Sequence, residues 1–435
     1  MTLSSTIRLA GSYLRTHFRR HVFIIIILAF SFGIIMTVTT VTAGMEYNLF
    51  LTAEHHYGGD VFIFGNDNPK IRLTRPDEIL RVIDVQRITY RKAVLRTLSY
   101  SDGVLYFAGT AVRQKYVFGI DWNAEEDSFR HLLFADGAPP SGLSENDIII
   151  SSAIADQLHA RRGDDLTLEV LTVNGQKNTG TFVVRGIIED RSIFGYFKCY
   201  TDRRRLNELL GFNPDDCSWI GFYYTNHDPA YFTAKAYQVY NALKDRYPMV
   251  KPADTREEFA EVFSDPGTAS IFRMPVFTLN AYISQVSDLL TALRIVSYFV
   301  FITMLIIALA SMSVSYRLIL HERSREIGTL RVMGLQSAST QVLLLAESLL
   351  VIVMAACLGM ALSLLLNWVL SLFSYSWIPG FDMLLYKGRL TAVYPASIIM
   401  TNMVVLLLTV LPAAWVPAFR IARADLPKVL FKETL

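Results

Sequence analysis

A short charged run, Tyr316 to Gly334, lies between two long apolar segments of this chain. Its arginines can present planar guanidinium forks to the carboxylates of a protein partner, and its glutamates can pair with basic groups. Its glycines permit close backbone approach or a helix end. The run is therefore a candidate docking segment. The residues that we assign to docking are Glu322, Arg323, Arg325, Glu326, Gly328, Arg331 and Gly334.

The spacing within this run supports one helical face. Glu322 and Glu326 are four residues apart, which places both on the same side of a helix. A plainer interpretation is that arginines gather beside membrane spans on the cytoplasmic side, with local pairs such as Glu322–Arg325 left in water. That interpretation fits a single arginine well, but it fits the whole string poorly.

Glu347 lies just inside the apolar segment that follows the charged run. A carboxylate within a membrane span is costly and usually has a partner or a functional role. We favour a structural role over a functional one: Glu347 either reaches water at the end of the span or forms an ion pair with Arg331.

No other residue pattern indicates catalysis. The sequence lacks the Gly-x-x-x-x-Gly-Lys-Ser/Thr spacing that cradles nucleotide phosphates, and no serine lies in Gly-x-Ser-x-Gly. His55 and His56 have no cysteine or carboxylate at ligand spacing, so we predict a surface pair rather than a metal site. We therefore expect no catalytic residue, no metal and no directly bound cofactor, and energy from ATP would have to come through a separate ATPase.

Three cysteines are too few for a disulfide framework. Cys199 and Cys217 either form one disulfide in an oxidising compartment or stay as thiols, and the sequence does not decide between these alternatives. Cys357 is expected to be a packing residue inside an apolar helix.

The composition is that of a membrane protein. Of 435 residues, 52% are hydrophobic and only 18% are charged, whereas about 25% of residues are charged in soluble domains. Four stretches lack charged side chains and exceed the roughly 20 residues that cross a bilayer core. They are Val22 to Met45, Ile295 to Tyr316, the segment from Ser348 towards Phe381, and Thr391 to Phe419. The third is expected to end near Phe373 to Trp377, before a Pro379-Gly380 turn.

Basic residues set the expected orientation, because short cytoplasmic flanks are enriched in Lys and Arg. They gather before the first span, after the second and after the fourth, whereas the connection between spans three and four holds only Lys387 and Arg389. We predict that both termini and the middle loop are cytoplasmic and that the long region after the first span faces outward. The first span is too long for a signal-peptide core, so we expect it to be retained.

The outward region, 46–287, combines strand and helix signals and predicts an α+β domain. Its strand-like runs are Asp60–Phe64, Val94–Tyr100, Val104–Ala108, Asp165–Thr172 and Thr181–Ile188. Asn174-Gly175 predicts a hairpin between the last two. Helices are expected from Ser151 or Ser152 to near Gly163, from Asp202 to Leu210 and from Ala230 to Asp245. An acidic balance and the lack of a basic stripe argue against nucleic-acid binding.

Two further amphipathic stripes flank the spans. The first has helical spacing, with arginines outside it, and consists of Leu3, Ile7, Ala10, Leu14 and Phe18. It predicts a basic helix that lies on lipid, and a disordered basic flank is the alternative.

The second stripe has coiled-coil spacing and precedes the second span. It favours either a stalk that extends that span and packs near Met45 to Leu51, or a helix packed on its own domain. Its residues are Leu279, Ile283, Val286, Leu290 and Leu293.

The charged run resembles the signature of the FtsX-like and MacB-like permeases of ABC transporters. The positions that carry this resemblance are Glu322-Arg323, Arg325 to Gly328, Leu330-Arg331, Gly334 and Glu347-Ser348. Parts of the outward region resemble the MacB-type periplasmic core domain, and the tail resembles the family's ending. These parts are Asn146 to Ser151, Ile154-Ala155, Gly163-Asp164, Val184 to Ile187 and Pro417 to Pro427.

This resemblance implies an α-helical membrane protein with four transmembrane helices and a large α+β extracytoplasmic domain inserted between helices 1 and 2. It divides the chain into a cytoplasmic helix (1–21), a first span (22–45), the outward domain (46–287), a second span (288–316), a coupling segment (317–340), a third span (341–373), a short outer loop (374–391), a fourth span (392–417) and a cytoplasmic tail (418–435).

In function, the resemblance implies a permease subunit in the bacterial inner membrane. Its protein partners would be a cytoplasmic ABC ATPase, which uses ATP, and a second permease subunit, which is either identical or paralogous. It would also contact membrane lipid and a lipoprotein or periplasmic adaptor. The outward domain is larger than that of FtsX, so efflux and lipoprotein-release permeases are nearer in architecture. The alternative is an FtsX-type regulator that activates an outer enzyme by transmitted motion.

Overall fold

A computed structural model describes residues 3–16, 18–65, 71–99, 103–114, 116–189, 194–226, 228–255, 257–258, 260–261, 273–333, 336–378 and 380–423. The chain divides into two compact units. The helical unit comprises Met1–Met45, Thr291–Phe373 and Leu390–Leu435. The sheet-rich unit comprises Glu46–Leu290 and Ser374–Arg389.

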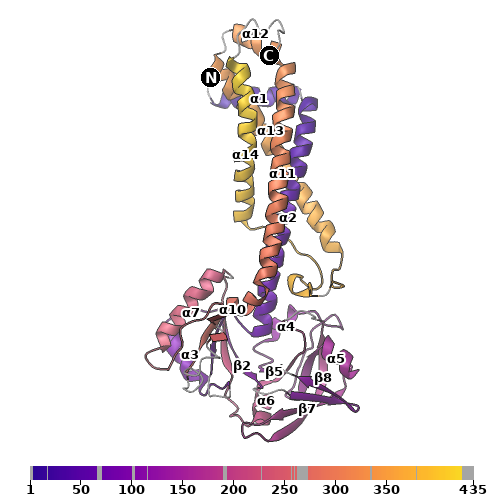
Figure 1. Ribbon diagram of the computed structural model, residues 1–435, viewed down its shortest axis with the longest axis vertical. Helices are drawn as coiled ribbons and strands as arrows, with labels where there is room; N and C mark the ends of the chain where they lie inside the picture. Colours follow the sequence, from indigo (N-terminus) through magenta and orange to yellow (C-terminus); the bar gives the residue numbers. More distant parts are fainter. Residues whose placement is uncertain are drawn as a thin grey trace. The chain divides into compact units, whose positions relative to one another are not determined.

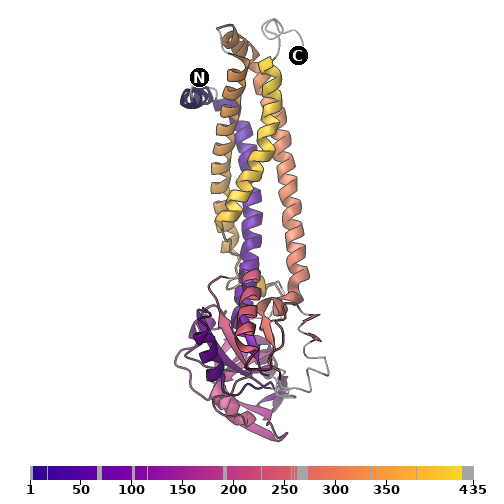
Figure 2. The same cartoon turned by 90° about the vertical axis from the view of Figure 1, so that its left-hand side faces the viewer.

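Among the described residues, four helices are long and apolar enough to cross a membrane. This confirms the number of candidate spans, while their orientation stays a prediction. Figures 1 and 2 show these helices running alongside one another within the helical unit. They are α2 (Phe18–Tyr57), α11 (Ser287–Glu322), α13 (Ser337–Leu372) and α14 (Ala396–Arg423).

Small residues bring α2 and α13 close together. A Cβ atom on Gly359 would lie 2.6 Å from the Ala29 carbonyl oxygen, and one on Gly33 would lie 2.9 Å from Leu362. Such close backbone approach strengthens dispersion contacts between apolar helices. Further along the same helices, the Asn367 amide donates a hydrogen bond to Thr40 Oγ1 at 3.0 Å.

The N-terminal helix α1 (Leu3–Thr16) has the amphipathic character that its sequence predicts. Ala10 and Leu14 are buried, whereas Arg8 and Arg15 are exposed. This excludes a disordered flank, and the contact of the helix with lipid stays a prediction.

The described part of the sheet-rich unit contains one sheet of eleven strands, in the order β11-β1-β10-β2-β5-β9-β6-β8-β7-β3-β4. Most neighbours are antiparallel, but β5 and β9, and β6 and β8, are parallel. The strands are β1 (Val61–Phe64), β2 (Lys92–Leu98), β3 (Gly103–Phe107), β4 (Thr110–Gln114), β5 (Tyr116–Ile120), β6 (Asp147–Ser151), β7 (Asp165–Leu171), β8 (Lys177–Ile188), β9 (Lys198–Asp202), β10 (Trp219–Tyr223) and β11 (Val276–Thr278).

Short helices complete this α+β unit. Among them, α3 and α7 lie side by side (Figure 1). Those in the described part of the unit are α3 (Pro76–Val85), α4 (Glu126–Arg130), α5 (Ser152–Leu158), α6 (Arg203–Leu210), α7 (Pro229–Leu243) and α10 (Leu279–Ile283). A sheet-rich domain thus lies between the first and second candidate spans in the chain.

Local turn and cap residues behave as their chemistry predicts, with one exception. Gly175, at φ 76°, turns the chain between antiparallel β7 and β8. The Asp202 carboxylate accepts hydrogen bonds from the backbone amides of Arg204 and Arg205 and so caps α6. The exception is α5, which ends at Leu158 rather than near Gly163, because His159 adopts a left-handed conformation at φ 56°.

The stripe before the second span is buried, but it does not form one continuous stalk. Leu279 and Ile283 lie on α10, Val286 on a 3-10 helix (Ser284–Val286), and Leu290 on α11. The chain bends here because the Leu279 amide is still bonded to the Asp60 carbonyl at 2.7 Å, which ties the start of the stripe to the sheet. The start of the stripe thus packs on its own domain, whereas Leu290 and the half-buried Leu293 lie on α11, the helix of the second span.

The connection between α13 and α14 also folds onto the sheet-rich unit. The Asn48 amide, near the end of α2, donates to the Leu384 carbonyl at 3.2 Å. Gly380, at φ 78°, lies in the expected turn, and Pro379 lies outside the described residues.

Candidate functional site

The charged run is divided between two helices. α11 ends at Glu322, and the short helix α12 (Ser324–Val332) begins directly after Arg323. The expectation that Glu322 and Glu326 share one helical face is therefore wrong, because the helix breaks between them. Glu322 is half exposed, and one of its carboxylate oxygens lies 3.8 Å from Nε of Arg20.

Arg323 lies at this break because its side chain turns inward to Glu347. Its Nη1 atom donates to both oxygens of the Glu347 carboxylate, at 2.7 and 2.9 Å. His21 Nε2, on α2, lies 3.1 Å from the same carboxylate. All three side chains are at least 96% buried. Glu347 thus forms an ion pair, but its partner is Arg323 rather than the expected Arg331, and it does not reach water.

Two tyrosines contribute further contacts around this cluster. The Tyr316 hydroxyl donates to the Leu344 carbonyl at 2.8 Å, which ties α11 to α13. The Arg323 guanidinium carbon lies 5.2 Å from the centre of the Tyr13 ring on α1. A buried charge pair with this many neighbours holds the α11–α12 turn in one position relative to α13, α2 and α1, because moving any member would strand a charge.

The helix α12 has one buried and one exposed face. Ile327 and Gly328 are buried, whereas Glu326, Val332 and Met333 are exposed. Val332 and Met333, adjacent at the end of this helix, are 62% and 72% exposed. Glu326 is also 3.3 Å from Nε of Arg323. The side chain of Arg325 and the whole of Gly334 lie outside the described residues.

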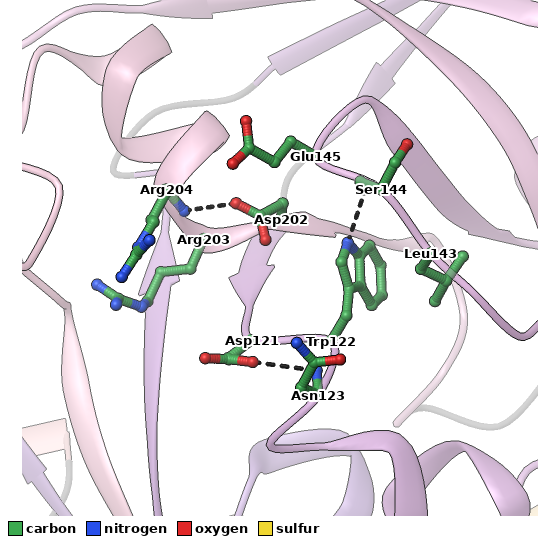
Figure 3. Close-up of a pocket in the computed structure, with 9 residues that line it drawn as sticks. All are labelled: Asp121, Trp122, Asn123, Leu143, Ser144, Glu145, Asp202, Arg203 and Arg204. Carbon is green, nitrogen blue, oxygen red and sulfur yellow. Dashed lines mark hydrogen bonds between the residues drawn. The ribbon is translucent and has the colours of Figure 1, made fainter.

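A cavity of about 350 Å³ in the sheet-rich unit is lined by nine residues, three of which are carboxylates. Figure 3 shows these residues. Asp121 accepts from the Asn123 amide at 3.0 Å, and Asp202 caps α6, so both acids shape the local backbone. Within the described ranges, no group of three or more His, Cys, Asp or Glu side chains is arranged to hold a metal ion.

His55 and His56 are buried, so the prediction of a surface pair is wrong. Helix α2 continues to Tyr57, and its last turn lies inside the sheet-rich unit. His56 Nδ1 is 2.8 Å from the Tyr200 hydroxyl, and the His55 ring stacks on His131 at 4.6 Å between centroids.

The cysteines form no bond to one another. Cys199 lies on β9 and Cys217 faces Leu73 in an isolated bridge, and both are buried thiols whose pKa values burial raises. Cys357 is exposed on the helical unit, so it is not the packing residue that we expected.

A second buried ion pair, which the sequence did not indicate, fixes the end of α2 to the sheet. Arg96 on β2 donates to the carbonyls of His56 and His55 at 2.7 and 2.8 Å, and its Nε donates to Glu125 at 3.0 Å. Arg96 and Glu125 are completely buried. Gly58, at φ 84°, follows the helix, and any side chain there would overlap the Arg96 guanidinium. The only sequence signal was an arginine within an apolar strand.

Asp60, just beyond α2, makes the stability of the sheet-rich unit depend on pH. Burial raises its pKa to about 7, although the Tyr224 amide donates to it at 2.7 Å. The folded state therefore binds this proton more tightly than the unfolded state, so the contribution of Asp60 to stability should fall as pH rises from about 4 to 7, by up to about 1.4 kcal/mol per pH unit. The nearby carboxyl of Glu54, whose pKa burial also raises, adds a fall in the same direction. Thermal unfolding of the purified chain at pH 5 and 8 measures this slope. Asp60→Asn should reduce it, and an unchanged slope in that variant would exclude Asp60 as its source.

Comparison with known proteins identifies the C-terminal part of the chain. Residues 298–426 match the family described as FtsX-like permease C-terminal, which confirms the resemblance of the charged run and the last spans. This match supports a permease of the ABC transporter type. No curated protein matches the chain.

One of the matching solved structures is the periplasmic region of MacB from Actinobacillus actinomycetemcomitans. The match has 12% identity and a TM-score of 0.27, and it covers 42% of this chain and 84% of that one. A likeness this weak carries no inference about this chain.

Proposed function

We propose that this chain is the membrane subunit of an ABC transporter and that α12 is the surface through which a separate cytoplasmic ATPase moves it. The observation that carries the proposal is the arrangement of α12, one face of which packs on the helical unit while the other exposes Glu326, Val332 and Met333. The family match over 298–426 gives independent support for a permease.

The buried cluster of Arg323, Glu347 and His21 would transmit the motion. A partner that pushes on α12 acts on a helix that Arg323 directly precedes, and the buried ion pair of Arg323 with Glu347 on α13 cannot be separated cheaply. His21 on α2 lies 3.1 Å from the same carboxylate. The displacement would therefore be carried into the candidate spans instead of being absorbed by a flexible loop.

For the outer side, the proposal is release of lipoproteins or export of a substrate that is already outside the membrane. In this proposal the chain lies in a bacterial inner membrane, with both termini in the cytoplasm and the sheet-rich domain facing outward. It pairs there with a second permease subunit. A specific observation keeps the FtsX-type regulator as the second candidate: Arg96 links the end of α2 to the sheet, a connection that would serve regulation of an outer enzyme equally well.

The interface is tested by affinity purification of the full chain from its native membrane, with identification of the bound ATPase by mass spectrometry. We expect the double substitution of Arg325 and Glu326 by alanine, and separately Val332→Asp, to weaken ATPase association by about tenfold or more, as is usual at the centre of an interface. ATPase stimulation by the chain should fall in parallel.

Val85→Asp is the matched control, because Val85 lies on α3 of the sheet-rich unit and is 79% exposed. It should leave association unchanged. The proposal fails if no ATPase accompanies the wild-type chain, or if the α12 variants retain normal association and stimulation.

A further inference from the structure

A cavity of about 640 Å³ lies in the sheet-rich unit beside the last turn of α2. Its size is within the range of small-molecule sites, about 300–1,000 Å³. The cavity shares no residue with α12, so a ligand site here is independent of the proposed function. The residues that line it are His55, Arg91, Lys92, Asp127, Ser128, Arg130, His131, Tyr223 and Tyr386.

The lining is strongly cationic. Arg91, Lys92 and Arg130 line the cavity together with one carboxylate, that of Asp127. Outside the lining, Arg91 also lies 3.4 Å from the buried carboxylate of Glu54. Arg130 pairs with Glu126 and Asp127 at the exposed rim, at 2.8 and 3.7 Å. Mutual repulsion within such a group is relieved when an anion binds.

Lys92 is the cation with the least compensation. Within the described ranges, no carboxylate lies within 4.0 Å of its ammonium nitrogen, which instead lies 5.5 Å from the centre of the Tyr223 ring. Burial is the main influence on this group and lowers its pKa. An anion in the cavity would replace the water that the ammonium has lost.

His55 supplies uncommitted polar atoms in the cavity wall. Its side chain is 94% buried, yet neither ring nitrogen has a hydrogen-bond partner. Buried polar groups are normally satisfied, so an exception needs an explanation. The stacking of His55 on His131 fixes the ring orientation, which leaves its nitrogens positioned for a ligand.

We propose that this cavity binds a phosphate group, carried either by a lipid headgroup or by a soluble phosphate ester, through Lys92, Arg91, Arg130 and His55. A phosphate offers several charged acceptor oxygens, which match the guanidinium, ammonium, imidazole and Ser128 hydroxyl donors gathered here. The tyrosine rings, Tyr223 and Tyr386, would pack against the group that carries the phosphate.

The test measures binding to the full chain purified in neutral detergent, by calorimetric titration. Glycerol 3-phosphate is the soluble probe, and short-chain phosphatidylglycerol is the lipid probe, with diacylglycerol as its phosphate-free counterpart. We expect at least one phosphate probe to bind and diacylglycerol not to compete. Binding of the soluble probe identifies a phosphate-ester site, whereas binding of the lipid alone identifies a headgroup site.

Three variants separate the cavity from general electrostatics. Lys92→Met, Arg130→Gln and His55→Phe, which keeps the stacking on His131, should each weaken binding by about tenfold. Lys251→Met and Arg162→Gln are the controls, because they remove the same charges at exposed positions elsewhere on this unit. Arg162 matches Arg130 in that it also pairs with an exposed acid, at 3.1 Å. Both controls should change affinity less than twofold. The proposal is overturned if neither phosphate probe binds, or if cavity and control variants behave alike. Unfolding temperatures identify any variant that misfolds. If the buried variants misfold, the binding affinity of Arg130→Gln decides the test, because the Arg130 side chain is exposed at the rim.

Discussion

Arg323→Met is expected to destabilise the helical unit by about 3–5 kcal/mol, because it leaves the Glu347 carboxylate buried without its guanidinium partner. His21 Nε2 lies 3.1 Å from the same carboxylate and is unchanged in this variant. The measurement is unfolding of the full chain in detergent, followed by near-ultraviolet circular dichroism. ATPase association should fall as well, since α12 would lose its fixed starting point.

A charge-removal cycle separates the ion pair from general packing. Arg323→Met combined with Glu347→Gln removes both charges and should recover most of the stability lost in the single variant. Arg317→Met is the control, because Arg317 is exposed on the same helix α11 and should change stability by less than about 0.5 kcal/mol. If the double variant is no more stable than Arg323→Met, the pair does not act as described.

The elements of this fold that follow local rules could be predicted from the sequence. Candidate spans are recognisable because each is a continuous apolar run of sufficient length, and the β7–β8 hairpin because Asn174-Gly175 suits its turn. The caps of α6 and the amphipathic stripe of α1 are equally local. Each of these signals lies within about 20 residues of the structure that it specifies.

Long-range pairings escaped prediction, because spacing in the chain does not reveal them. Glu347 was assigned to Arg331, the nearer arginine, but the break after α11 turns Arg323 inward, 24 residues away. His55 was placed on the surface because the apolar signal of the first span ends at Met45, whereas the helix continues to Tyr57. In both cases the decisive fact was where a helix ends, which hydropathy alone does not fix.

Arg96→Met is expected to have the largest effect on the sheet-rich unit, again about 3–5 kcal/mol from the stranded Glu125 carboxylate. It also removes the donors to the carbonyls of His55 and His56, each worth about 1 kcal/mol. For a unit of this size the unfolding midpoint should drop by roughly 10 °C or more. Hydrogen exchange should increase most in the last turn of α2, while α13 stays protected.

The two losses can be separated, because only one of them is electrostatic. Arg96→Met with Glu125→Leu removes the stranded carboxylate, so it should regain most of the midpoint temperature. The last turn of α2 should nevertheless still exchange faster than in the wild type, since its carbonyls remain without the guanidinium. Arg81→Met, at an exposed position on α3, should change neither quantity. Full protection of that turn in the double variant would mean that Arg96 serves only to neutralise Glu125 and does not anchor the helix to the sheet.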